Sequence, residues 1–396
     1  MGVTSMLARW ASKSVHVLIV GVPGWDESRM LLEAELDRRG WRVALSPADA
    51  DLLAVCGLPG EVLGAASDLL WNQLPGPRTR VSVTTPVALS ALLDAAVAHL
   101  VDDSWQREDA RARSRPVAAE DPRPNTGEHE SMSHEDMDHG DMDHGGMDMP
   151  TPGGIPLAGG GDDRDGLEMD VLNVSLGPVL PHWPAGLVVD CVLQGDVIVS
   201  AGARLLEAAS APKEVSEKAV TDVTRGRRRI IRLCDDASNL LALAGWQTAA
   251  QNARRLRDDA RRGADSTDHA AALDRLRRRA ERSVLLRWSL KGISLGEIGL
   301  GAGTNTGTAT PDDQAAVDIR HRLIGWLREA AVLAGTSSGR QSPAAGDSDP
   351  VREAQDALEA LPELLRGTDL GTARLLIAGL GLDTAALAQT HERTHD

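Results

Sequence analysis

The chain of 396 residues is long enough to form two or three domains, and its formal net charge is −16. It contains no Phe and no Tyr, so its cores must be built from aliphatic side chains, alanine and nine Trp, a composition that favours helices. The three cysteines, Cys56, Cys191 and Cys234, are widely spaced and form no CxxC pair. This spacing excludes a disulfide scaffold and argues against an iron–sulfur cluster held by this chain alone.

Residues 1–14 carry charged side chains but no long apolar run, and the longest apolar stretches fall short of a membrane span. We therefore expect no signal peptide and no transmembrane segment. The expected location is the cytoplasm, with any membrane association made through partner proteins.

Residues 15–101 alternate short apolar runs with segments of helical periodicity. The predicted strands are Val15–Val20, Trp41–Leu45, Asp51–Cys56 and Arg80–Val83, and the predicted helices are Glu27–Arg39, Glu61–Trp71 and Pro86–Leu100. Strands that alternate with helices pair in parallel through right-handed crossovers, which predicts an α/β, doubly wound (flavodoxin-like) domain. A site in such a sheet lies at the carboxyl ends of the strands, here 21–25, 56–60 and 84–85.

Residues 102–166 are rich in Asp, Glu, Arg, Pro, Gly and His and poor in apolar side chains. Between residues 102 and 170 there are 19 Asp and Glu against 6 Arg, a balance of −13, so the acidity of the chain belongs to this stretch. Such a segment buries too little surface to offset its ordering entropy, and we expect a disordered acidic linker.

The centre of this linker is a fourfold pentad repeat in which histidine and methionine alternate. Imidazole suits copper, nickel and zinc, whereas thioether selects copper(I), so the repeat offers several interchangeable metal sites on a flexible backbone. The other interpretation is a spacer that arose by duplication and serves only solubility. The candidate metal ligands are His129, Met132, His134, Met137, His139, Met142, His144, Met147 and Met149.

Residues 167–390 are expected to form a mainly α domain that opens with a short β-hairpin. Met169–Leu176 and Gly186–Val199 are the predicted strands, and the helices are expected over 213–262, 267–290, 313–335 and 350–390. Trp246, Trp288 and Trp326 fall among apolar positions and are predicted as core anchors. The arginine runs 225–229 and 275–282 lack an aromatic stacking surface, which favours a solvated or partner-facing helix surface and no nucleic acid.

Two stretches resemble one pair of proteins. Ser46-Pro-Ala-Asp-Ala-Asp-Leu-Leu-Ala-Val-Cys-Gly57, followed by Trp71-Asn-Gln-Leu-Pro-Gly-Pro-Arg78, resembles the small, cluster-bearing subunit of respiratory complex I. Leu176-Gly-Pro-Val-Leu-Pro-His-Trp-Pro-Ala-Gly-Leu187, followed by Leu193-Gln-Gly-Asp-Val-Ile198, resembles the start of the large, quinone-facing subunit. Both subunits are related to those of nickel–iron hydrogenases, so the resemblance implies a fused relative of the two.

The departures from these families lie at the reactive positions. The resemblance implies cysteine ligands after the first and fourth strands, but the loops here read Gly21-Val-Pro-Gly-Trp25 and Val83-Thr-Thr-Pro86. Cys56 matches no ligand position and is expected in the core. The two quinone-site histidines of the large subunit fall on Leu180 and Pro184, and His182 between them is the candidate cofactor-binding residue, with a turn residue as the simpler interpretation.

These observations favour a pseudoenzyme, a complex I- or hydrogenase-like accessory or assembly protein without iron–sulfur or quinone-site ligands and without catalytic residues. Its expected partners are the proteins of a respiratory or hydrogenase-type complex. One alternative is a NADH–quinone oxidoreductase-type subunit that is active only with partners. Another is a copper- or nickel-binding protein that acts through the His–Met linker.

Overall fold

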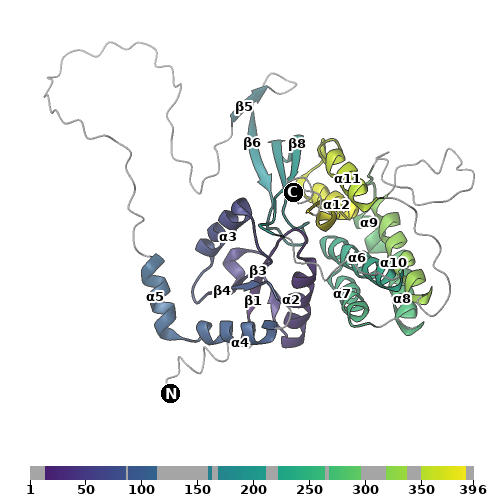
Figure 1. Cartoon of the computed structure of the whole chain (residues 1–396). Helices are drawn as coiled ribbons and strands as arrows, with labels where there is room; N and C mark the ends of the chain where they lie inside the picture. The colour runs from purple at the N-terminus through teal and green to yellow at the C-terminus, as the bar shows by residue number, and fades with distance from the viewer. Residues whose placement is uncertain are drawn as a thin grey trace, which may run out of the picture.

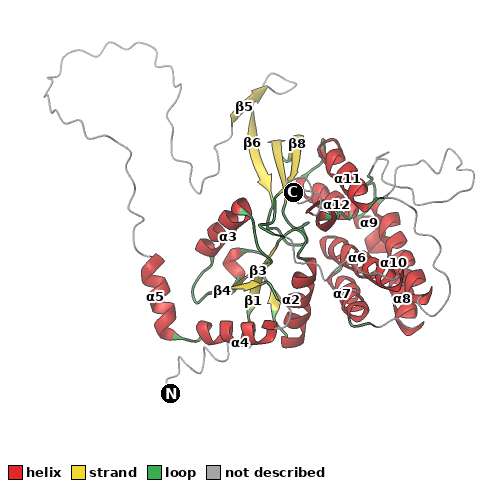
Figure 2. Ribbon diagram, viewed as in Figure 1, coloured by secondary structure: helices red, strands yellow, loops and turns green. Residues whose placement is uncertain are grey.

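The computed structural model describes residues 14–85, 88–113, 159–162, 168–210, 222–263, 267–295, 318–336 and 349–388. Figures 1 and 2 show an N-terminal part with a sheet between helices, and a second part in which an antiparallel sheet leads into a group of helices. Within the described ranges, every helix is too short or too polar to cross a membrane.

The N-terminal sheet is parallel. Its strands are β1 (His16–Gly21), β2 (Arg42–Val43), β3 (Leu52–Cys56) and β4 (Thr79–Val83), in the order β2-β1-β3-β4. Helices α2 (Asp26–Arg39) and α4 (Leu89–Leu100) pack on one face, and α3 (Glu61–Gln73) packs on the other. All residues of β3 are buried, as expected for a strand that is covered on both faces. The predicted α/β domain with a parallel sheet is confirmed.

A further helix, α5 (Asp103–Arg113), lies within the stretch that the sequence predicted as linker. It is held by the buried Arg78, whose Nε and Nη2 atoms each donate to a carboxylate oxygen of Asp109 at 3.0 Å. The Arg78 guanidinium also lies 3.9 Å from the centre of the Trp71 ring. This helix has a polar composition and is fixed by long-range contacts, which local periodicity does not reveal. The rest of the predicted linker lies outside the described residues, apart from 159–162.

The second part begins with an antiparallel sheet in the order β5-β6-β7-β8. Its strands are β5 (Gly159–Asp162), β6 (Glu168–Leu176), β7 (Leu187–Gln194) and β8 (Val197–Leu205). The single strand predicted over 186–199 is therefore two strands, because Gly195 takes a positive φ of 60° and reverses the chain.

The predicted helical segments are confirmed in character but are divided into shorter helices. These are α6 (Asp222–Leu243), α7 (Gln247–Arg261), α8 (Thr267–Arg282), α9 (Val284–Ser289), α10 (Ile319–Thr336), α11 (Pro350–Leu365) and α12 (Leu370–Leu380). Gly245 (φ 82°) separates α6 from α7, and Gly367 (φ 77°) separates α11 from α12. Ser283 caps α9 by accepting a hydrogen bond from the Leu286 amide.

The three tryptophans predicted as core anchors have different environments. Trp326 is buried, and Trp246 is partly buried against the core of the helical part. The prediction for Trp288 is wrong, because 77% of this residue is exposed. Leu286 and Leu290 of the short α9 segment point into the core, so a residue two positions from each lies on the opposite side of the helix.

Candidate functional site

The two parts meet at the carboxyl ends of the parallel strands. Val188 and Leu206 of the second part belong to the same apolar cluster as residues of β1 and β3. The Ala209 amide donates to the Leu58 carbonyl at 3.0 Å, and a Cβ atom at Gly186 would overlap the Pro23 ring. The ends of β1 and β3, two of the strand ends at which the sequence placed a site, are therefore in contact with the second part.

A cavity of about 1270 Å³ lies between the two parts. It is lined by the start of α2, by the loop of residues 178–185, by α6 and α7, and by residues that follow α12. His182, the candidate cofactor-binding residue of the sequence, is one of its lining residues.

Four charged side chains form a closed ring beside this cavity, which we call the ion ring. It consists of Arg29 and Glu33 of α2, Asp235 of α6 and Arg257 of α7. Arg29 lies 2.9 Å from Glu33 and 2.7 Å from Asp235. Arg257, whose side chain is 0% exposed, lies 2.7 Å from Glu33 and 2.6 Å from Asp235. Each guanidinium therefore bridges the same two carboxylates, and the ring crosses the interface.

The electrostatics of the ion ring follow from its burial and its pairing. Burial alone raises the pKa of Glu33, but the guanidiniums of Arg257 and Arg29 outweigh it and hold that pKa well below its usual value. The same balance of burial against Arg29 and Arg257 lowers the pKa of Asp235. The ring is thus ionised at neutral pH with two charges of each sign. Its arginines pair with both carboxylates, so the charges are satisfied within the protein.

His182 adopts a strained backbone conformation in the loop that lines the cavity. Its φ of 57° is the one positive value for a non-glycine residue in the described part of the chain. Its Nδ1 atom lies 3.3 Å from the Asn239 Oδ1 atom of α6. Burial lowers the pKa of His182, so the imidazole is neutral at pH 7. The prediction of a turn residue is confirmed, and the turn faces the cavity.

Asp236 is the second titratable group of note in the cavity wall. Burial raises its pKa to about 7, and its closest cation, Arg232, lies 3.8 Å away and pairs with Asp383. A carboxyl group with this pKa exchanges its proton near neutral pH. The cavity wall therefore contains a neutral imidazole and a carboxyl group with a pKa near 7, a set suited to proton exchange or to hydrogen bonding with a polar ligand.

The loop after β1, where the resemblance implies adjacent cysteine ligands, is filled by an indole. Trp25 is 8% exposed, and its Nε1 atom donates to the Ser210 carbonyl at 3.0 Å. Its ring lies so close to Gly57, after β3, that a Cβ atom there would overlap it. Gly57 also has a positive φ of 113°. The space between the two strand ends is thus occupied by the protein's own side chain.

The three cysteines are buried and unpaired. Burial raises the pKa of Cys56 and of Cys234 to about 12, and it also raises the pKa of Cys191. The expectation that Cys56 is a core residue is confirmed, since it is 0% exposed. No group of three or more His, Cys, Asp or Glu side chains that suits a metal ion occurs among the described residues. The metal candidates from His129 to Met149 lie outside those residues.

The sequence interpretation missed the ion ring and Asp236. A signal was present, because Asp235 and Asp236 follow Cys234 within the apolar periodicity of α6, and Arg257 follows Leu256 among the alanines of α7. Charged residues on an otherwise apolar helix face indicate buried pairing. The partner on α2 is not identifiable in this way, because Arg257 and Glu33 are 224 positions apart.

Compared with family models, with curated proteins and with solved structures, the chain matches none of them.

Proposed function

We propose that the protein is a non-catalytic relative of the small and large subunits of respiratory complex I and of nickel–iron hydrogenases, with both parts joined in one chain. It would act as an accessory or assembly factor for a complex of that type. The sheet order and the helices on both of its faces support the doubly wound, flavodoxin-like fold that the resemblance implies for the N-terminal part.

The observation that carries this proposal is the filled loop after β1. Trp25 lies in the loop after β1, where the resemblance implies cysteine ligands, and it packs on Gly57. Cys56, which precedes Gly57, is fully buried in the core of the N-terminal part. The ion ring joins the two parts, because arginines and carboxylates from both parts form ion pairs with one another. A protein that retains the contact between the parts but fills the cluster position with an indole is suited to a structural role in a larger assembly.

The first test is iron and acid-labile sulfide analysis of the full-length chain after anaerobic purification. We expect neither element in stoichiometric amount. One cluster equivalent per chain would overturn the proposal.

The second test is complementation of cells that lack the chain. We expect the deletion to lower the NADH–quinone or hydrogenase activity of their membranes. A thiol-free chain carrying Cys56→Ala, Cys191→Ala and Cys234→Ala should restore that activity, whereas Arg257→Met, which breaks the ion ring, should not. The proposal fails if the deletion changes neither activity or if the thiol-free chain folds but does not complement.

A second candidate function is an oxidoreductase subunit that works only with a cluster-bearing partner. It is favoured by the cavity that holds His182 and the titratable Asp236. The distinguishing measurement is NADH- or quinone-dependent electron transfer in a purified complex that contains the chain. Loss of that activity with Asp236→Ala or His182→Ala, while the complex stays assembled, would support this function over the accessory role.

A further inference from the structure

The most exposed apolar side chains of the described chain lie on α9. Val284, Leu285 and Trp288 are exposed by 70%, 78% and 77%, while Leu286 and Leu290 hold the segment against the core. Three large apolar residues within five positions on one short helix form a projecting apolar group. Such a group in contact with water marks a surface that binds something.

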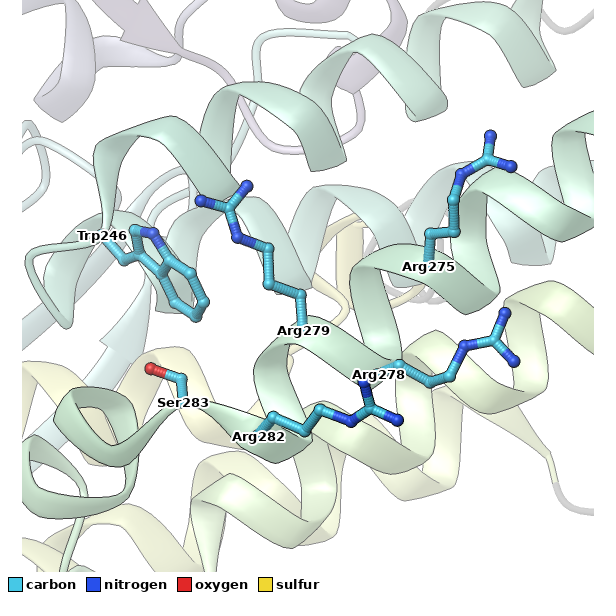
Figure 3. A pocket seen from close by; sticks show the side chains of 6 residues that line it. All are labelled: Trp246, Arg275, Arg278, Arg279, Arg282 and Ser283. Carbon is cyan, nitrogen blue, oxygen red and sulfur yellow. The ribbon is translucent and has the colours of Figure 1, made fainter.

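A group of arginines lies on α8, the helix that directly precedes α9 in the chain. Arg275, Arg278, Arg279 and Arg282 line a shallow depression of about 520 Å³ together with Trp246 and Ser283. Figure 3 shows these side chains around the depression, with Arg279 and Trp246 beside each other. The Arg279 guanidinium lies 5.2 Å from the centre of the Trp246 ring, which holds it in place.

Among the described residues, most of these cations have no anionic partner. Asp274 pairs with Arg277 and Arg278, and Glu281 pairs with Arg277. Arg275, Arg279 and Arg282 form no ion pair within the part of the chain that the structure describes. The same holds for the exposed Arg287 and Lys291 on the α9 side. From residue 282 to residue 295 the sequence contains no Asp and no Glu.

We propose that α9 and the arginine side of α8 form a docking surface for a bilayer that contains anionic phospholipids. Val284, Leu285 and Trp288 enter the boundary between headgroups and acyl chains, and the neighbouring arginines contact the lipid phosphates. Guanidinium groups suit this role, because their planar fork donates two hydrogen bonds to one phosphate.

The chemistry of the surface favours a bilayer over an acidic protein. A protein–protein interface carries both hydrogen-bond donors and hydrogen-bond acceptors. This surface instead offers cations and apolar side chains, and residues 282–295 include no carboxylate. The apolar residues also project from the helix, which suits insertion into a fluid layer. The expected mode is therefore peripheral attachment by α9.

The test is co-sedimentation of the full-length chain with lipid vesicles. Vesicles of phosphatidylcholine are compared with vesicles that also contain phosphatidylglycerol, at low and at high salt. We expect binding to the anionic vesicles and loss of binding at high salt, because the arginine contribution is screened. Trp288→Ala and Leu285→Ala should each lower the partition coefficient by about tenfold or more. Arg279→Gln and Arg282→Gln should each lower it by about fivefold.

Matched control variants distinguish binding through this surface from non-specific adsorption of the protein to vesicles. Leu69→Ala shortens a leucine on α3 that is 64% exposed. Arg262→Gln removes the charge of the residue that follows α7, whose side chain is 67% exposed. Both should leave binding unchanged. The proposal is overturned if the chain does not sediment with anionic vesicles, or if the controls weaken binding as much as the α9 and α8 variants do. It is also overturned if this surface instead binds an acidic protein or a second copy of the chain, with no vesicle binding.

Discussion

Arg29 and Asp235 are 206 positions apart in the chain, and the Arg29 Nη2 atom lies 2.7 Å from the Asp235 Oδ2 atom. This contact joins the first helix after β1 to the first long helix of the second part. Both side chains are mostly buried, so neither has bulk water as a substitute partner. The stability of the interface therefore depends on the completeness of the ion ring.

Removing Arg257 is expected to be strongly destabilising. Arg257→Met leaves the buried carboxylates of Glu33 and Asp235 with one guanidinium between them, so the free energy of unfolding should fall by about 3–5 kcal/mol. Urea unfolding followed by circular dichroism measures the change. Arg262→Met, at an exposed position, should change the stability by less than about 0.5 kcal/mol. Equal midpoints for the two variants would show that the ring contributes nothing.

Replacing Asp236 should produce a pH-dependent gain in stability. The pKa of Asp236 in the folded protein, about 7, lies above its unfolded value of 3.8. The contribution of Asp236 to the free energy of unfolding is therefore fully present below pH 3.8, and it is lost as the pH rises through 7. Asp236→Asn removes this loss and should stabilise the protein by about 2–4 kcal/mol at about pH 8. The gain should shrink toward zero near about pH 4. A gain that is the same at both pH values would contradict the assigned pKa.

The ion ring has the opposite pH dependence. The pKa values of Glu33 and Asp235 are lowered in the folded state, so their contribution is present above the unfolded values and is lost as pH falls through the folded ones. Acid should therefore weaken the interface below about pH 4. In a Glu33→Gln variant, the part of the acid dependence that Glu33 supplies should disappear, as measured by unfolding at a series of pH values.

Adding a methyl group at Gly57 should disturb the packing of the first loop. Gly57→Ala forces a side chain onto the Trp25 ring and into a backbone conformation that favours glycine, so we expect a loss of at least about 2 kcal/mol. Gly64→Ala is the matched control, because its Cβ atom meets nothing within 4 Å and α3 should gain slightly from alanine. Thermal unfolding of both variants measures the difference. Similar losses would refute the close packing of Trp25.

The strain at His182 is measurable by comparing two substitutions. His182→Ala removes the contact with Asn239 and keeps a side chain at positive φ, whereas His182→Gly removes the contact and relieves the strain. The glycine variant should therefore be more stable than the alanine variant by about 1 kcal/mol. Chemical unfolding of both proteins tests this difference, and the opposite order would exclude backbone strain in this loop.

The sequence predicted the N-terminal strands and helices well, because short apolar runs and glycine turns are local signals. It missed the turn at Gly195, since apolar residues continue on both sides of it. It also missed α5, whose position depends on Arg78 and Asp109 and not on its own composition. Trp288 was misplaced because an apolar residue in an apolar region gives no sign of the side of the helix on which it lies.

The candidate site was less predictable than the fold. His182 was identifiable from a loop motif, and the structure places it in the cavity. The ion ring joins helices from both parts, and nothing in the spacing of Arg29 and Glu33 indicates which distant charges meet them. Sequence periodicity identifies the face of a helix that is buried, but the partner of a buried charge is a property of the assembled structure.

The ion ring also determines how the two parts can be matched to each other. Arg29 and Glu33 are one helical turn apart on α2, and the opposing charges come from Asp235 and Arg257. A slip of α2 by one turn, about 5.4 Å, would bring Glu33 toward Asp235 and place like charges in contact without water. The alternation of charge along α2 thus fixes the register in which the two parts pack, and it disfavours a shifted register that apolar packing alone would allow.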